Sequence, residues 1–210
     1  MLYKLNLPKP TIELETIAMD IANSYTINYD SIEWHKKIQK ENTNIVSGIF
    51  QNREDLITKT RSEYQKFFTH KIYPTIGLLE NINKNVGHTG CYPPHSDRLR
   101  HVVLNYYFKL GGENVVTTFY NKYDDPTDKI GGYVVKYGDL DISNQYLTRK
   151  DAWYNFNSRQ YHSVENIEDK RIILSIAVDT DFLTFYNSYK NIYNLSETEN
   201  KVICGASEGT

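Results

Sequence analysis

The chain has little of what marks secreted, membrane or nucleic-acid-binding proteins. Its 210 residues include two cysteines, Cys91 and Cys204, too few and too far apart for a disulfide framework, so they favour a reducing compartment. It has no run of about 18 apolar residues that would span a membrane and no apolar segment typical of a signal peptide. A net charge of -2 disfavours tight non-specific binding to nucleic acid. We expect a cytoplasmic protein with no membrane or nucleic-acid partner.

What the chain does have is tyrosine. The 18 tyrosines favour strands, because aromatic side chains suit a half-buried pleated surface. The hydrophobic share of 40% and the charged share of 24% are ordinary for a soluble globular protein. The length predicts one domain, 1–210, which we divide into helical support (1–72), a β core (73–180), and a C-terminal helix and tail (181–210).

Apolar residues at helical spacing predict helices before the β core. Thr11 can cap a helix over 12–24, whose first turn holds Glu13 and Glu15. The same reasoning predicts further helices at 31–40, 53–69 and 181–193.

After Pro74, short runs of β-favouring residues alternate with turn residues, including Gly111-Gly112 and Gly131-Gly132. The predicted strands lie near 75–82, 87–92, 101–109, 115–120, 132–137, 152–157, 161–164 and 171–178. Helices followed by about eight short strands predict a mainly β fold with flanking helices. We expect a double-stranded β-helix, the cupin-like jelly roll, braced by the N-terminal helices.

Three residues form a candidate metal site. His95 and Asp97 stand two apart in PPHSD, so in an extended segment their side chains point the same way. His162 follows Asp97 by 65 residues and would come from a neighbouring strand. Two imidazoles and one carboxylate can occupy one face of an ion, an arrangement that suits non-heme Fe(II) and O2 chemistry.

Two strands predict a site for a small acid beside that metal. In RIILSIAV, at 171–178, one face is wholly apolar and the other carries Arg171 and Ser175. In VVLNYYF, at 102–108, Asn105 and Tyr107 share one face. A buried arginine needs a partner, and a bound dicarboxylate would provide one with two parallel hydrogen bonds.

These segments together resemble the Fe(II)/2-oxoglutarate-dependent dioxygenases, near the prolyl-hydroxylase-like branch. The resemblance covers 93–178 and rests on PPHSD, VVLNYYF, Gly111-Gly112, TTF at 117–119, YHSVEN at 161–166 and RIILSIAV. It implies that His95, Asp97 and His162 bind Fe(II). It implies that Arg171, aided by Tyr107, holds the distal carboxylate of 2-oxoglutarate, with Ser175 at a nearby hydroxyl position and Asn105 as a further candidate.

The activity implied is hydroxylation by O2, coupled to oxidation of 2-oxoglutarate to succinate and CO2. The substrate would be an amino acid, a protein side chain or another small metabolite. Two alternatives remain open at this point: a non-catalytic jelly-roll module that binds metal or ligand, and a zinc hydrolase with the same three ligands. Arg98 and Arg100, just after the metal motif, are interpreted as solvated charges.

Overall fold

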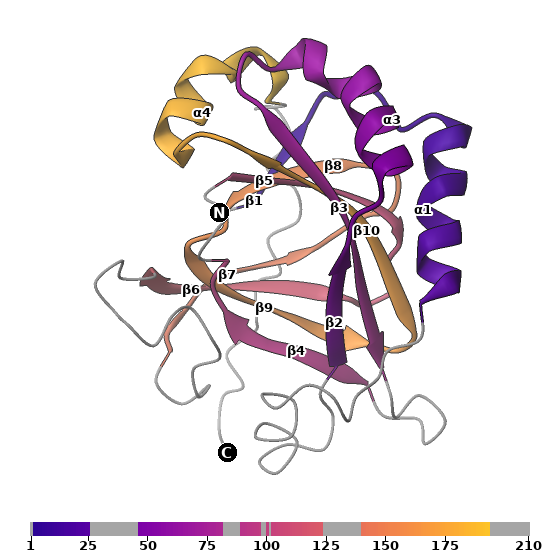
Figure 1. Ribbon diagram of the computed structural model, residues 1–210. Coiled ribbons are helices and arrows are strands. Elements are labelled where there is room, and N and C mark those ends of the chain that lie inside the picture. Colours follow the sequence, from indigo (N-terminus) through magenta and orange to yellow (C-terminus); the bar gives the residue numbers. More distant parts are fainter. Residues whose placement is uncertain are drawn as a thin grey trace, which may run out of the picture.

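The computed structural model of the protein describes residues 2–25, 46–81, 89–97, 100, 102–123 and 140–193, with backbone alone at 46–50. Two antiparallel β-sheets face each other as a sandwich, and helices cover the outer face of the larger sheet (Figure 1). The prediction of a mainly β fold with flanking helices is confirmed. The predicted helix at 31–40 and strand at 132–137 lie outside the described residues.

The larger sheet has six strands in the order β1-β8-β5-β10-β3-β2. The bounds are β1 Leu2–Leu5, β8 Trp153–Asn157, β5 Val102–Lys109, β10 Lys170–Val178, β3 Ile72–Asn81 and β2 Val46–Gln51. The centre of this sheet is β10, which pairs with β5 on one side and β3 on the other. The strand predicted at 75–82 corresponds to β3, which begins earlier, at Ile72, and includes Pro74. A proline is tolerated there because β2 pairs with β3 only between Ile76 and Asn81, so Pro74 lies beyond its end.

The smaller sheet has four strands in the order β4-β9-β6-β7. The bounds are β4 Gly90–His95, β9 Gln160–Ile167, β6 Val116–Tyr123 and β7 Ile142–Leu147. Strand β4 is an edge strand, and it holds Pro93 and Pro94. Its pairing with β9 shifts register between Tyr92 and His95, so the two prolines sit where the ladder is already irregular.

The helices form one wall of the main apolar core. The predicted helix at 12–24 is α1, Ile12–Ser24, and the Thr11 hydroxyl accepts a hydrogen bond from the Leu14 N–H, as a cap should. The region 53–69 forms α3, Glu54–Tyr64, and then tightens into the 3-10 turn η2, Gln65–Phe67. The region 181–193 divides into α4, Phe182–Ser188, and the 3-10 turn η5, Lys190–Ile192. No helix within the described part of the chain is long and apolar enough to cross a membrane.

Both alternations predicted from the sequence are present. Along β10, Ile172, Leu174, Ile176 and Val178 belong to the core cluster under the helices. Along β5, Leu104, Tyr106 and Phe108 do the same. The opposite faces of both strands therefore point between the two sheets, where they line a cavity.

Three strands were absent from the prediction, β1, β2 and β7. Each is the last strand on one side of its sheet. Edge strands commonly have interrupted or polar sequences, and β7 reads ISNQYL while β2 contains Gly48. The segment 1–72, predicted as helical support, thus also supplies β1 and β2 to the larger sheet.

Candidate metal and keto acid site

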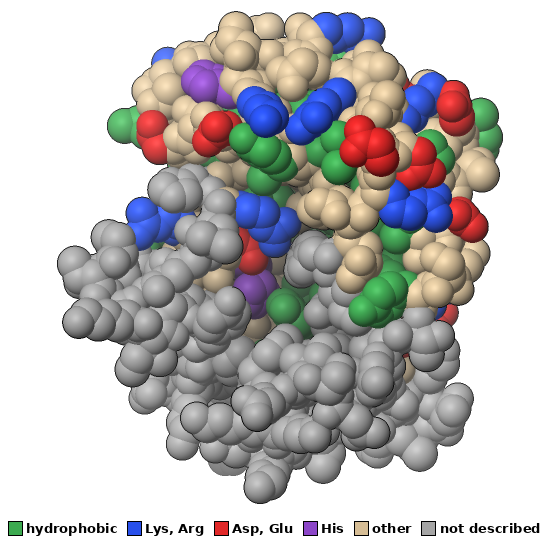
Figure 2. Space-filling view, viewed as in Figure 1, with side chains coloured by type: hydrophobic (Ala, Val, Ile, Leu, Met, Phe, Trp, Pro, Cys, Tyr) green, Lys and Arg blue, Asp and Glu red, His purple; other side chains and the backbone are tan. Residues whose placement is uncertain are grey.

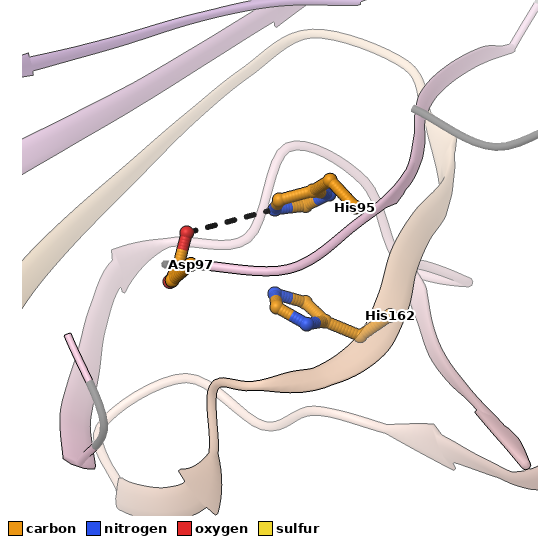
Figure 3. A group of neighbouring side chains, drawn as sticks. All are labelled: His95, Asp97 and His162. Carbon is orange, nitrogen blue, oxygen red and sulfur yellow. Dashed lines mark ion pairs between the residues drawn. The ribbon is translucent and has the colours of Figure 1, made fainter. Parts of the chain in front are cut away.

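The three predicted metal ligands converge at the inner side of the smaller sheet (Figure 3). His95 ends β4 and lies opposite His162 of β9 in the register of the two strands. Asp97 follows β4, and its backbone N–H donates to the Ser158 carbonyl at 2.8 Å. One ligand atom from each of the three side chains lies within 4.8 Å of the others. Atoms bound to one ion at about 2.0–2.2 Å lie at most about 4.4 Å apart, so the three side chains would close slightly around a shared ion.

Backbone carbonyls orient both imidazoles. Nδ1 of His95 lies 2.8 Å from the Pro93 carbonyl, and Nδ1 of His162 lies 2.9 Å from the Gln160 carbonyl. A carbonyl oxygen only accepts, so each Nδ1 carries the proton and each Nε2 keeps its lone pair. This arrangement is typical of histidines that bind metal through Nε2.

Burial sets the protonation states that a cation needs. Burial, reinforced by the neighbouring His95, lowers the pKa of His162 to about 3. Burial also lowers the pKa of His95, against the opposing effect of Asp97. Burial alone would raise the pKa of Asp97, but Arg100 and the two imidazoles outweigh it and hold that pKa below its usual range. Near neutral pH the site therefore offers two neutral imidazoles and one carboxylate.

Aromatic rings hold the two histidines in place. The rings of His95 and His162 lie with centroids 4.3 Å apart. His162 packs against Phe156 at 4.9 Å and Phe119 at 5.9 Å, while Tyr92 meets His95 edge-on at 4.6 Å. Because the rings are fixed by packing on several sides, little conformational entropy is left to lose when a ligand binds.

A cavity lies between the sheets and opens beside the three ligands. Its volume, measured as space open to the centre of a water molecule, is about 50 Å³. In Figure 2 a hollow in the molecule shows basic, acidic and histidine side chains together. The lining residues are Leu79, Tyr92, His95, Asp97, Arg100, Val103, Asn105, Tyr107, Thr117, Phe156, His162, Val164, Arg171, Ile173 and Ser175. Asp97 is the one carboxylate among these described residues.

Arg171 is the buried cation of this cavity. Its side chain is 1% exposed, and burial lowers its pKa, although a guanidinium stays charged at any ordinary pH. One terminal nitrogen, Nη2, donates to the Thr148 hydroxyl at 3.3 Å. Nε and Nη1 have no hydrogen-bond partner among the described residues. A buried charge with two unsatisfied donors is costly, which indicates a site for an anion.

The other predicted keto acid contacts line the same cavity. Tyr107 lies beneath Arg171, with 4.3 Å between the guanidinium carbon and the ring centroid. Asn105 is 9% exposed, and its Oδ1 has no partner among the described residues. Ser175 lies opposite Asn105 in the β5–β10 register, and its hydroxyl accepts a hydrogen bond from Arg100. All four residues are thus brought to one wall, that of β5 and β10.

Two residues of the cavity region were missed from the sequence. Arg100 is not a solvated charge: its Nη2 lies 3.1 Å from Asp97 Oδ2, and its side chain is 21% exposed. The sequence did carry a signal for this contact, because Arg100 follows Asp97 of the metal motif by three residues. Thr148, just beyond β7, contacts Arg171 from a segment whose strand was not predicted, so no local signal pointed to it. Arg98 lies outside the described residues.

Comparisons with known proteins add little to what the site residues indicate. No family model matches the chain, and no curated protein matches it. Among solved structures, one that matches is reported as a prolyl 4-hydroxylase from Phytophthora capsici, with 15% identity and a TM-score of 0.33. The match covers 70% of this chain and 52% of that one, so it spans about half the length of the hydroxylase. At that TM-score the match carries no argument about function, and the case rests on the residues of the site.

Proposed function

We propose that this chain is an Fe(II)- and 2-oxoglutarate-dependent dioxygenase that hydroxylates a small-molecule or peptide substrate. The observation that carries the proposal is one cavity with two matched features. Three ligand atoms of His95, Asp97 and His162 gather within 4.8 Å, and the buried Arg171 has two donors without described partners. A metal and an organic acid would satisfy both at once.

The donor set fits Fe(II). Two imidazole nitrogens and one carboxylate oxygen leave positions open on the metal, which is the pattern of non-heme iron oxygenases. His95 and His162 would bind through Nε2, since Nδ1 of each faces a carbonyl. When bound, Fe(II) and 2-oxoglutarate supply the activation of O2 and the oxidation of the keto acid to succinate and CO2.

The β5–β10 wall fits the dicarboxylate. Arg171 would receive the distal carboxylate on its free Nε and Nη1 donors, with the ring of Tyr107 fixing the plane of the guanidinium. The Ser175 hydroxyl already accepts from Arg100, so its own proton remains to donate to an acid. Asn105 would contribute its amide from the adjacent strand. These residues orient the keto acid and exclude water from it.

We also propose that the β-sandwich is a jelly roll and that residues 1–210 form one domain. We expect the protein to act in the cytoplasm. The substrate is an amino acid, a protein side chain or another small metabolite, and it would approach the open side of the metal. Nucleic acid is not proposed as a substrate, given the net charge of -2.

The test measures succinate release with Fe(II), 2-oxoglutarate and O2 over a panel of amino acids, peptides and metabolites. Wild type should release succinate, and His95→Ala should lose it. The protein should also be purified without oxygen and its metal content measured. Bound zinc with no succinate would favour a zinc hydrolase, and metal or ligand binding without turnover would favour a non-catalytic module.

A further inference from the structure

The two carboxylate oxygens of Asp97 face different partners. Oδ1 lies 4.0 Å from His95 Nε2, on the side where the metal ligands converge. Oδ2 lies 3.1 Å from Nη2 of Arg100. The Asp97 side chain is only 16% exposed, so the oxygen that does not meet a metal still needs a partner. Arg100 provides that partner.

Arg100 is itself held from a second direction. Its Nη1 donates to the Ser175 hydroxyl at 3.3 Å, and its backbone N–H donates to the Asp97 carbonyl at 3.1 Å. Ser175 lies in the centre of β10, on the same face as Arg171. A planar guanidinium with donors in a fixed fork can satisfy both contacts at once. Arg100 therefore links the segment after β4, in the smaller sheet, to the central strand of the larger one.

We infer that Arg100 is a positioning residue for the metal site: it fixes the Asp97 carboxylate so that Oδ1 alone is presented to the ion. The inference rests on the proposed function, because it assumes that the three ligands bind a metal. It assigns Ser175 a role in the absence of any keto acid, namely holding Arg100 in place. Carboxylates that bind metal are commonly held by such outer contacts, whose loss weakens affinity about 10–100-fold.

Charge and orientation act in opposite directions on metal affinity, so the variants must separate them. Removing the positive charge of Arg100 would reduce its repulsion of a cation and could mask the loss of orientation. Arg100→Lys keeps the charge but replaces the planar fork by a single ammonium, which cannot reproduce both contacts in the same geometry. Ser175→Ala changes no charge and removes one contact of Arg100. Both variants therefore report on orientation.

The experiment titrates the metal-free full chain with Co(II), without oxygen and without keto acid, and follows the visible absorption of the bound ion. Arg100→Lys should weaken Co(II) binding about tenfold, and Ser175→Ala should weaken it in the same direction by a smaller factor. The matched control is Arg53→Lys, because Arg53 forms an exposed pair with Asp20 and Asp55 outside the cavity. It should bind Co(II) as wild type does.

The outcomes distinguish the inference from the proposed function. If His95→Ala binds Co(II) as tightly as wild type, the three ligands are not a metal site and the proposed function fails. If His95→Ala loses Co(II) while either Arg100→Lys or Ser175→Ala binds it with wild-type affinity, the positioning role is overturned. Ser175→Ala is a small change on a strand, so it keeps the test decisive if Arg100→Lys does not fold.

Discussion

The guanidinium carbon of Arg171 lies 4.3 Å from the centroid of the Tyr107 ring, so the buried cation covers an aromatic face rather than meeting an acid. Such a contact is favourable, but it does not replace the hydrogen bonds that Nε and Nη1 lack among the described residues. The ligand-free fold is therefore less stable than it would be with this charge hydrated, because Arg171 is already desolvated before any ligand binds. An anion that enters the cavity gains from a group already stripped of water and held in place.

This relationship predicts opposite effects of Arg171→Met on stability and on binding. Methionine of similar length removes an uncompensated buried charge, so unfolding of the ligand-free protein should cost about 1 kcal/mol more. Binding of 2-oxoglutarate to the metal-loaded protein should weaken by about 1.5–3 kcal/mol, because a carboxylate loses its charge-assisted partner. Urea unfolding and calorimetric titration measure the two quantities. Unchanged affinity for 2-oxoglutarate would remove Arg171 from the keto acid site.

The stability of the metal-free protein should fall in mild acid. The pKa of His162 is lowered to about 3 in the folded protein, against about 6.5 for an unfolded histidine. Between those values the unfolded state binds more protons, so stability rises with pH through this window and is lost as pH falls. The His162 contribution amounts to about 2 kcal/mol between about pH 7 and about pH 5. The pKa of His95 is also lowered, so it acts in the same direction.

Urea unfolding at several pH values measures this effect, and His162→Gln is the comparison. Glutamine does not titrate, so that variant should show a shallower fall of stability between about pH 7 and about pH 5. An equal fall in both proteins would mean that His162 is not the group responsible.

Asp97→Gly should separate metal binding from folding. The substitution removes the carboxylate of the proposed metal site and keeps the hydrogen bond from Arg100 to Ser175. We expect Fe(II) affinity to drop at least tenfold and succinate release to fall with it, while the thermal transition persists. The variant also opens a metal position where chloride could bind, so products should be analysed by mass spectrometry with chloride present. Full retained turnover would show that Asp97 is not a ligand.

Gly111→Ala should disturb the proposed keto acid site beside Arg171, near the start of β10. Gly111 has φ of 87°, a left-handed conformation that costs a residue with a side chain about 1–2 kcal/mol. An added Cβ would also lie 3.1 Å from the Arg171 Cβ and 3.3 Å from its backbone nitrogen. We expect lower stability by about 1–3 kcal/mol and weaker 2-oxoglutarate binding, with Co(II) affinity unchanged. A loss of stability without any change in 2-oxoglutarate binding would contradict the link to Arg171.

The parts of the fold with strong periodicity could be predicted from the sequence. The helix at 12–24 has a capping residue, acids in its first turn and regular apolar spacing, and its bounds match. Strand β10 is buried on both faces, and its alternation correctly separated the core side from the cavity side. Strands β1, β2 and β7 could not be predicted, because an edge strand is held by pairing with its neighbour more than by its own pattern.

The candidate site was predictable where ligand chemistry leaves a spacing in the sequence. His95 and Asp97 are two residues apart, and their meeting with His162 followed from the expectation of neighbouring strands. The contact of Arg100 with Ser175 could not be predicted, because it joins residues 75 positions apart and depends on how the two sheets face each other. The contact of Thr148 with Arg171 has the same origin.

The pairing of His95 with His162 joins an edge strand to its neighbour at a point where hydrogen bonding is sparse, since Pro93 and Pro94 have no N–H to donate. An ion held by both imidazoles would act there as a crosslink. The free energy of metal binding would then stabilise the folded position of β4 as well as prepare the site for its reaction, because a ligand that binds only the folded form stabilises that form. Scarcity of that metal would thus leave this edge of the smaller sheet easier to open and more exposed to proteases, making the lifetime of the protein responsive to its metal supply.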